Sequence, residues 1–488
     1  MKRKWTKPVV AIAALALVAA ACGGDDDDAG SDEPAESTAD EGTADEGTAD
    51  EGTADEGTAD EGTADEGTAD AGSGESLLDG AIPCENQHEG KTVSIFSPVR
   101  VSEGDPLVVE EFVAGYEPLM ECTGVEIVWQ GTDQFETEIN VRLQGGDPPD
   151  VIDYPQPGLM TSHVEGGYLI PLPEDLAAST ASDFISGWDS YATVDGTVYG
   201  IPGRSNVKSL VWYSPSRFAE AGYTVPESLE DLKALSDQIV ADGSVPWGVG
   251  AESGVATGWV LTDWMEDFML HTNGEEVYDQ WVNHEIPFND PQVAAVADAV
   301  GSFVKNPDYL GGDNLVKAIA TTKFQDGGLC VATGDCWLHR QASFYSTLFP
   351  EGTDVSPEGD VWYFYLPSPA DGPKYLLGAG DIYAAATDKP ESMDVLRYTG
   401  SVDYQLYMVN TRGELSPHKS IDVAAIEDPL VRGLSELQLG ADVFRFDASD
   451  LMPGAVGSGT FWTEITAWVI GSTDTQTMLD NIEASWPS

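Results

Sequence analysis

The sequence is poor in basic residues. Only 22 Lys and Arg stand against 85 Asp and Glu in 488 residues, a formal net charge of −63. A charge this negative repels phosphate backbones and anionic headgroups, so nucleic acid is excluded as a partner. Long apolar runs are also scarce. The apolar run at residues 9–21 has 13 residues, too few for a helix to span a bilayer. No later segment has the roughly 18 consecutive apolar residues that a spanning helix needs.

Several catalytic and nucleotide-binding motifs are missing as well. The chain has no Gly-x-Ser-x-Gly elbow, no His-Glu-x-x-His zinc motif and no Gly-x-x-x-x-Gly-Lys-Ser/Thr phosphate loop. The missing phosphate loop argues against an ATPase of the P-loop class. These absences do not exclude a secreted glycoside hydrolase. Such an enzyme needs only a pair of carboxyl groups, and this acidic chain has many.

The N-terminus predicts export and lipid anchoring. A basic start and the apolar run at residues 9–21 are typical of a signal peptide. Cys22 follows three alanines directly, as in a bacterial lipobox, where the cysteine is acylated after cleavage; the −3 residue is Ala rather than the commoner Leu. We expect residues 1–21 to be removed and Cys22 to hold the protein on the outer face of the cytoplasmic membrane. The alternative is an ordinary signal peptide with an incidental cysteine.

Residues 22–83 are expected to form an acidic, low-complexity tether. From Thr38 the pentapeptide Thr-Ala-Asp-Glu-Gly repeats six times, and residues 23–80 contain no basic residue. Such a segment lacks the apolar residues needed for a core. Metal binding by its carboxylates is the alternative. A flexible chain of this length spans roughly 45 Å, and a cell-surface carbohydrate-binding adhesin would also suit such a spacer.

Four further cysteines predict two disulfides. An exported chain with an even number of cysteines favours disulfides, although four cysteines allow three pairings. Local closure favours Cys84–Cys122 and Cys330–Cys336. Zinc is the alternative, but no His lies at ligand spacing beside either pair.

The remainder of the chain alternates between strand and helix patterns. One helix is expected from Asp105-Pro106 through Met120, and capping residues at Ser228 and Asp290 predict two more. A hairpin turn is expected at residues 194–197. This alternation predicts an α/β fold with mainly parallel sheets in two lobes. The strands are expected at residues 91–96, 125–129, 151–154 and 209–213.

Several runs resemble one known family when they are taken in order along the chain. They are Ser94-Ile95-Phe96-Ser97-Pro98-Val99-Arg100, Gln144-Gly145-Gly146-Asp147-Pro148-Pro149-Asp150-Val151, Asn206-Val207-Lys208-Ser209-Leu210-Val211-Trp212-Tyr213, Gly258-Trp259 with Asp263-Trp264, and His339-Arg340-Gln341-Ala342-Ser343-Phe344. This order, over residues 91–488, resembles the family 1 extracellular solute-binding proteins of carbohydrate ABC importers, especially their alpha-glucoside-binding branch.

The resemblance implies a two-lobed periplasmic-binding-protein fold like that of maltose-binding protein, with discontinuous lobes joined by hinge strands. The first lobe is then expected at residues 84–203 and 378–428, and the second at 204–377 and 429–488. The glycines of Gly378-Ala379-Gly380-Asp381 suit a hinge. The implied function is a receptor, not an enzyme, that captures a neutral mono- or oligosaccharide and delivers it to ABC permease subunits. We expect a monomer, without cofactor or metal.

A sugar site needs polar groups for the hydroxyls and aromatic rings for the apolar faces. The resemblance places a sugar-facing loop at residues 252–264, and it implies a cleft-facing Arg340 and an aromatic residue at the start of the last helices. Arg100 and the residues after the 151–154 strand follow strand ends, where open α/β sheets bind ligands. The expected sugar-binding residues are Arg100, Gln134, Asp153, Tyr154, Gln156, Asn206, Glu252, Trp259, Asp263, Arg340, Asp381 and Trp462.

Overall fold

The computed structural model describes residues 76–101, 107–185, 187–369 and 372–487, all within one compact unit of residues 71–488. Residues 1–75, with the predicted signal peptide, Cys22 and most of the tether, lie outside the described residues. Within the described ranges, no helix is both long and apolar enough to cross a membrane. Strands β1 (Ser76–Leu77) and β2 (Ile82–Pro83) pair with each other, and Ile82 is fully buried, so residues 76–83 belong to the folded body rather than to the tether.

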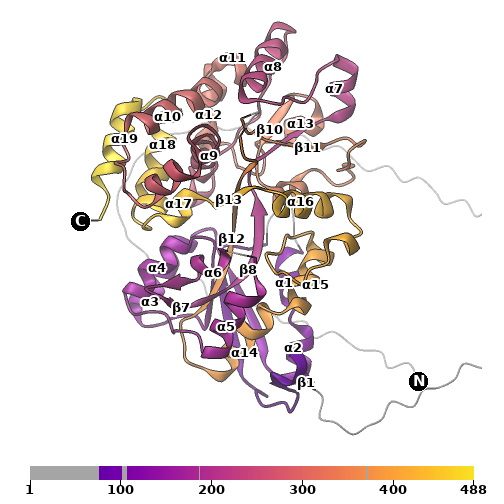
Figure 1. The fold of residues 1–488 in the computed structure, drawn as a ribbon, viewed down its shortest axis with the longest axis vertical. Coiled ribbons are helices and arrows are strands. Elements are labelled where there is room, and N and C mark those ends of the chain that lie inside the picture. Colours follow the sequence, from indigo (N-terminus) through magenta and orange to yellow (C-terminus); the bar gives the residue numbers. More distant parts are fainter. Residues whose placement is uncertain (1–75, 102–106, 186, 370–371, 488) are drawn as a thin grey trace, which may run out of the picture. The chain divides into compact units, whose positions relative to one another are not determined.

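A six-stranded sheet forms the centre of one lobe, drawn in the lower half of Figure 1. Its order is β13-β12-β5-β3-β4, and β8 joins it by pairing with β12. β3 is parallel to β4 and β5, whereas β12 is parallel to β13 and antiparallel to β5 and β8. The bounds are β3 (Thr92–Ser97), β4 (Glu126–Gly131), β5 (Val151–Tyr154), β8 (Gly200–Val207), β12 (Tyr375–Ala385) and β13 (Val443–Phe446).

The second lobe contains a three-stranded sheet in which β9 (Leu210–Tyr213) is antiparallel to both β10 (Leu338–Arg340) and β11 (Trp362–Tyr365). The prediction of mainly parallel sheets is wrong for this lobe. Its helices do not alternate singly with strands as crossovers between parallel neighbours. Seven of them, α7 to α13, instead follow one another between β9 and β10.

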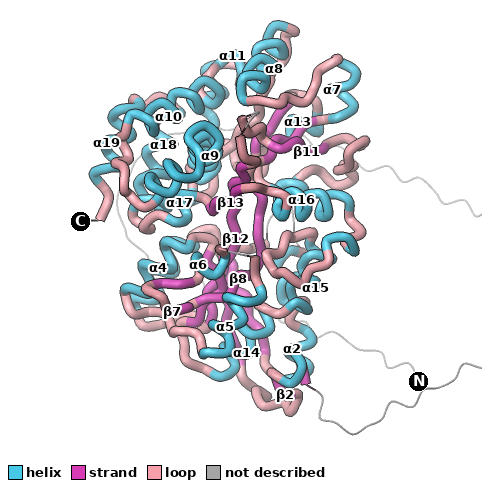
Figure 2. Tube along the Cα trace, viewed as in Figure 1, coloured by secondary structure: helices cyan, strands magenta, loops and turns pink. Residues whose placement is uncertain are grey.

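Helices cover both sheets, as the cyan coils of Figure 2 show. Those of the first lobe are α1 (Val108–Ala114), α2 (Glu117–Thr123), α3 (Phe135–Gly145), α4 (Pro157–Glu165), α5 (Glu174–Asp183), α6 (Trp188–Tyr191), α14 (Pro390–Thr399) and α15 (Val402–Arg412). Those of the second are α7 (Pro215–Ala221), α8 (Leu229–Ala241), α9 (Trp259–Val282), α10 (Pro291–Val304), α11 (Pro307–Leu310), α12 (Asp313–Ala318), α13 (Leu329–Thr333), α16 (Pro429–Leu439), α17 (Ala448–Leu451), α18 (Trp462–Val469) and α19 (Thr475–Ala484).

The single helix predicted to reach Met120 is in fact two, α1 and α2, with a break at Gly115 and Tyr116. Pro118 explains the break, because it has no N–H to donate to the preceding turn, and it is tolerated in the first turn of α2. The predicted cap at Asp105 lies outside the described residues. The other caps are confirmed: Ser228 accepts from the Asp231 N–H and Asp290 from the Gln292 N–H.

The hairpin turn is also confirmed. β6 (Thr193–Val194) pairs with β7 (Thr197–Val198) across Asp195 and Gly196. Both turn residues have positive φ, 50° and 76°, as a type I′ turn requires. Asp and Gly are therefore suited to this turn by their tolerance of the left-handed region.

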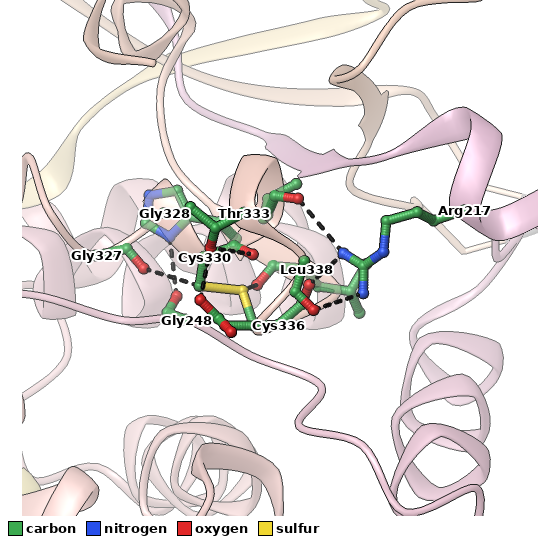
Figure 3. The surroundings of a disulfide bond; sticks show 12 residues. Arg217, Gly248, Gly327, Gly328, Cys330, Thr333, Cys336 and Leu338 are labelled. Atoms are coloured by element: carbon green, nitrogen blue, oxygen red, sulfur yellow. Dashed lines mark hydrogen bonds between the residues drawn. A yellow bond between two sulfur atoms is a disulfide. The ribbon is translucent and has the colours of Figure 1, made fainter. Parts of the chain in front are cut away.

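Both predicted disulfides are present. Cys84–Cys122 links the segment after β2 to α2, and Cys330–Cys336 closes a short loop after α13 starts. Figure 3 shows this second bridge beside Arg217, whose guanidinium donates to the carbonyls of Gly334 and Cys336 at 2.9 and 2.8 Å. The loop is therefore held at two places, by the covalent bond and by the Arg217 fork.

Each lobe has its own core. In the first, Val93 and Ile95 of β3 pack with Phe112 of α1. In the second, Trp264 and Phe268 belong to a larger cluster around α9 and α10. Two buried strands, β8 and β12, run between these cores (Figure 1). The exact residues at which the lobes begin and end stay a prediction.

The glycines of the expected hinge have a packing role. A Cβ atom at Gly378 would lie 2.3 Å from the Phe444 ring, and one at Gly380 would lie 2.3 Å from the Arg204 carbonyl oxygen. The β8–β12 pairing also shifts register between Gly380 and Ile382, the sign of a bulge. Glycine is required here for close approach of the two crossing strands.

Candidate functional site

A cavity of about 870 Å³ lies between the two lobes, with the crossing strands β8 and β12 contributing to its wall. Its lining includes the segment after β3 and the start of α3 from the first lobe. From the second lobe come the segment 252–259, the loop 323–329 and the ends of β13 and α17. Seven of the residues predicted from sequence line it: Arg100, Gln156, Asn206, Glu252, Trp259, Asp381 and Trp462.

The two lobes touch beside this cavity. Gly254, in the turn before α9, has φ of 60°, and a Cβ there would lie 3.1 Å from the Asp133 carbonyl oxygen and 3.2 Å from Gln134 Nε2. On another side, Gly158 of α4 packs against the Met452 carbonyl oxygen so closely that a Cβ would collide with it. Contacts of this kind require glycine, since any side chain would push the lobes apart.

Aromatic rings form one part of the cavity wall. The Trp259 ring lies 5.2 Å from that of Phe324 and 6.1 Å from that of Phe344, centroid to centroid. All three line the cavity, and Trp462 lines it from the start of α18 with only 2% of its surface exposed. Rings fixed in this way offer flat apolar faces at little entropic cost to a ligand with apolar C–H faces.

Arg204 organises the wall near the crossing strands. Its guanidinium forms a short ion pair with Asp381 and a second pair with Glu414 at 3.1 Å. It also lies 5.3 Å from the centre of the Phe112 ring. Burial acts to lower the pKa of Arg204, but the fields of Asp381 and Glu414 outweigh it and hold the pKa well above its ordinary value. Asp381 is therefore committed to a buried pair.

Lys208, directly after β8, organises a second group of charges. It donates to Asp263 Oδ1 at 2.8 Å and forms a shorter contact with Asp447. Behind this pair, Arg340 donates to Asp263 Oδ2 at 3.0 Å and to Asp267. These side chains are almost completely buried. Lys208 and Asp447 line the cavity, whereas Asp263, Asp267 and Arg340 lie behind it.

More buried acids than bases share this network. Glu266, fully buried, accepts from the Ser449 N–H through Oε1, and its carboxyl group also meets that of Asp447. Burial raises the pKa of Asp263 to about 7, and burial together with Asp447 raises the pKa of Glu266 well above its ordinary value. Burial acts on Asp447 in the same direction, but Lys208 outweighs it and lowers its pKa. These shifts favour the ionised form of Asp447 and the protonated form of Glu266.

Five predicted site residues do not line the cavity: Gln134, Asp153, Tyr154, Asp263 and Arg340. Asp153 accepts from Ser97 Oγ at 2.7 Å, and the Tyr154 hydroxyl meets His163 at 2.7 Å, both within the first lobe. The Arg340 guanidinium is used by Asp263 and Asp267, not turned toward the cavity. Gln134 begins α3 and meets Gly254 at the contact between the lobes. Trp264 likewise packs in the core, beside Trp247 and Phe303.

Sequence reasoning missed several charged residues of the lining: Glu136, Arg204, Lys208, Glu414, Asp447 and Asp450. Lys208 had a usable signal, since a lysine directly before an apolar strand must find acidic partners when it is buried. Asp447 and Asp450 follow β13 in the run Phe446-Asp447-Ala448-Ser449-Asp450, at the strand end where α/β sheets commonly bind ligands.

Comparison with known families gives a match over residues 104–392, more than half of the chain, to the model described as bacterial extracellular solute-binding protein. The chain belongs to this family. The chain is similar to the osmoprotective compounds-binding protein GgtB of Synechocystis, which is 41% identical over 78% of this chain and 89% of its own. The alpha-glucosides-binding periplasmic protein AglE of Rhizobium meliloti is 38% identical over 82% of this chain and 88% of its own.

Several solved structures share the fold at low sequence identity. A chitin oligosaccharide binding protein superimposes with a TM-score of 0.68 at 16% identity, covering 81% of this chain and 98% of its own. RafE in complex with raffinose gives 0.62 at 19%, with the same shares covered. Maltose-bound MalE3 of T. maritima gives 0.62 at 16%. The two-lobed α/β fold of sugar-binding proteins is thus confirmed for this chain.

Proposed function

We propose that the protein is the substrate-binding receptor of a carbohydrate ABC importer and that it captures a neutral sugar or oligosaccharide between its lobes. The observation that carries this proposal is the cavity of about 870 Å³ with Trp259 and Trp462 in its wall. Such rings suit the apolar faces of a sugar, and the amides and carboxylates around them suit its hydroxyls.

The cations of the wall favour an uncharged ligand. Arg204 is paired with Asp381 and Glu414, and Lys208 with Asp263 and Asp447. At the rim, Arg100 is paired with Asp133 at 3.0 Å. A ligand carboxylate or phosphate would have to break such pairs, which is costly when they are buried. A neutral polyhydroxy compound accepts and donates hydrogen bonds without doing so.

Within this class we propose an alpha-glucoside, since the name of AglE specifies alpha-glucosides. The name of GgtB specifies osmoprotective compounds, and an osmoprotectant that carries a glucosyl group would satisfy both names. Titration of the purified protein with maltose, sucrose, trehalose, raffinose and glycine betaine separates these options. Binding is monitored by calorimetry and by Trp fluorescence. Saturable 1:1 binding of an alpha-glucoside is expected. Binding of betaine alone would refute the sugar proposal.

The same titration tests the enzyme alternative. We propose that bound sugar is released unchanged, so chromatography of the mixture after long incubation should show only the sugar added. Appearance of monosaccharide products from an oligosaccharide would favour the glycoside hydrolase, and binding to insoluble polysaccharide without binding of soluble sugars would favour the adhesin.

We further propose that the receptor is a monomer, that Cys22 is lipidated and that the partners are permease subunits with a separate ATPase. Cells that express the protein are grown with a labelled fatty acid. The wild type is expected to carry the label, whereas Cys22→Ala is expected to be unlabelled and released from the membrane. Labelling of Cys22→Ala, or its retention on the membrane, would refute lipid anchoring at Cys22. Retention of sugar-loaded receptor by vesicles that contain the permease tests the partners.

A further inference from the structure

Two acidic side chains reach the cavity from opposite lobes without a cation of their own. Glu136 comes from the first turn of α3 in the first lobe, and Asp450 from α17 in the second. Both line the cavity, and Asp450 is 8% exposed. Glu136 Oε1 accepts from Gln156 Nε2 at 3.0 Å. Among the ion pairs between described residues, neither carboxyl group takes part in one.

The described cation that acts on Asp450 is already paired with other acids. Lys208 faces it but already serves Asp263 and Asp447, and the buried Glu266 lies in the same network. Arg340, further back, is taken by Asp263 and Asp267. The charged groups that act on Asp450 are therefore Lys208, Asp263 and Asp447 from its own lobe and Glu136 from the other lobe.

We propose that closure of the lobes around a sugar takes up one proton from solvent, held by the pair Glu136 and Asp450. This inference rests on the proposed function. With one proton, the pair offers an O–H donor and carboxylate acceptors to sugar hydroxyls. Without it, closure leaves two anions in the wall of one cavity, where burial weakens the screening of their repulsion.

The direction of both pKa shifts agrees with this geometry. Burial raises the pKa of Glu136. Burial and then Asp447 raise the pKa of Asp450 well above its ordinary value, and Glu136 adds to the effect. When the lobes are apart, water solvates both groups and their pKa values move back toward about 4. The closed form thus binds more protons than the open form, and sugar affinity falls as pH rises between these pKa values.

The test is calorimetric titration of the full-length protein with maltose, or with whichever of sucrose, trehalose and raffinose binds instead. The titration is made at one pH near 6.5, in buffers with different ionisation enthalpies. The slope of observed enthalpy against buffer enthalpy counts the protons exchanged. Uptake of about one proton is expected, with a Kd that rises up to about tenfold per pH unit above that pH. Sugar binding with zero slope would overturn proton uptake and leave the proposed function standing, whereas absence of any sugar binding would overturn both.

The variants Glu136→Gln and Asp450→Asn assign the proton. Each keeps the size of the side chain and removes one acid, so the slope should fall toward zero and the pH dependence of Kd should flatten. Glu230→Gln, at an acid in the first turn of α8 outside the cavity wall, is the matched control and should keep the wild-type slope. Circular dichroism establishes that each variant is folded. Full proton uptake in both cavity variants would place the proton elsewhere, for example on Glu266, and overturn the assignment.

Discussion

The Lys208 ammonium lies 5.5 Å from the centre of the Trp259 ring while it donates to Asp263 Oδ1 at 2.8 Å. One cation therefore connects the buried acidic network of the second lobe to the aromatic wall of the cavity. Its interaction with the π face of the ring holds the indole in place from one side. Phe324 and Phe344 contact the same ring, so the orientation of Trp259 is fixed before a ligand arrives.

Trp259→Ala is expected to weaken sugar binding strongly. The variant removes a preorganised ring face, and a Kd about tenfold higher, or more, corresponds to a loss of about 1.4 kcal/mol or more. Because Trp259 is only partly buried, its removal should lower the melting temperature little. Calorimetry and thermal unfolding of the same sample measure both. A large fall in melting temperature with unchanged Kd would instead make Trp259 a core residue.

Lys208→Met should destabilise the fold. Removal of the ammonium leaves Asp447 and Asp263 buried without this partner, and loss of one member of a buried pair costs about 3–5 kcal/mol. Lys233→Met is the matched control, since its pair with Asp237 is exposed and should contribute less than about 1 kcal/mol. Denaturant unfolding of both variants gives the comparison. Equal stabilities of the two variants would contradict the role given to Lys208.

The stability of the protein should fall as the pH rises from about 6.5 to about 8. Asp263 has its pKa raised to about 7, and the pKa values of Glu266 and Asp450 are also raised, so between the unfolded and folded pKa values the folded state binds more protons. Under that condition the free energy of unfolding decreases with pH. Asp447, whose pKa is lowered, opposes the trend at lower pH, and so do His163 and His339, whose pKa values burial lowers to about 4. The histidines act only below about pH 6.5, where an unfolded histidine still binds a proton.

Surface repulsion in this acidic protein acts in the same direction, so salt separates the two causes. Screening at about 0.5 M salt weakens repulsion between exposed charges but leaves buried groups little affected. The melting temperature should still be higher at the acid end in high salt. If salt abolishes the difference, exposed carboxylates and not the buried network are its source.

The two disulfides should have different effects when each pair is replaced by serine. Cys84–Cys122 closes a segment of sequence separation 38 and should contribute about 4 kcal/mol on the loop-entropy model. Cys330–Cys336, with a separation of 6, should contribute about 2 kcal/mol.

The second pair should affect ligand binding more. It lies next to the loop 323–329 that lines the cavity, and a Cβ on Gly248 would lie 2.2 Å from the Cys330 sulfur, so the bridge is packed tightly against its support. Its loss should raise Kd more than loss of the first pair, as measured by calorimetry on both double variants. Equal effects on Kd would refute this difference.

Local patterns in the sequence were sufficient for many elements of the fold. The strand Val151–Tyr154 has the predicted bounds, and Ser228 and Asp290 cap helices as expected. These features depend on a few neighbouring residues. The break between α1 and α2 depends instead on Pro118, and the antiparallel sheet of the second lobe depends on pairings between strands more than a hundred residues apart.

The site was predictable where a residue follows a strand end, as Gln156 does, or carries a partly buried aromatic ring, as Trp259 does; both residues line the cavity. Arg340 and Asp263 were predicted to line the cavity but lie behind its wall, because their ion pairs fix the orientation of their side chains. Asp263 is 77 residues from Arg340 and 55 from Lys208. A single sequence does not reveal which acid pairs with a buried Lys or Arg, because the excess of Asp and Glu leaves many candidate partners.

The ion pair between Lys208 and Asp447 joins residues 239 positions apart. Asp447 directly follows β13, a strand close to the C-terminus that pairs with β12. A chain that emerges from a ribosome or a translocon with its N-terminus first holds Lys208 long before Asp447 exists beside it. The second lobe therefore cannot complete its core until almost the whole sequence is available. Contacts so distant in sequence delay folding, which keeps a nascent chain extended enough to pass through a secretion channel.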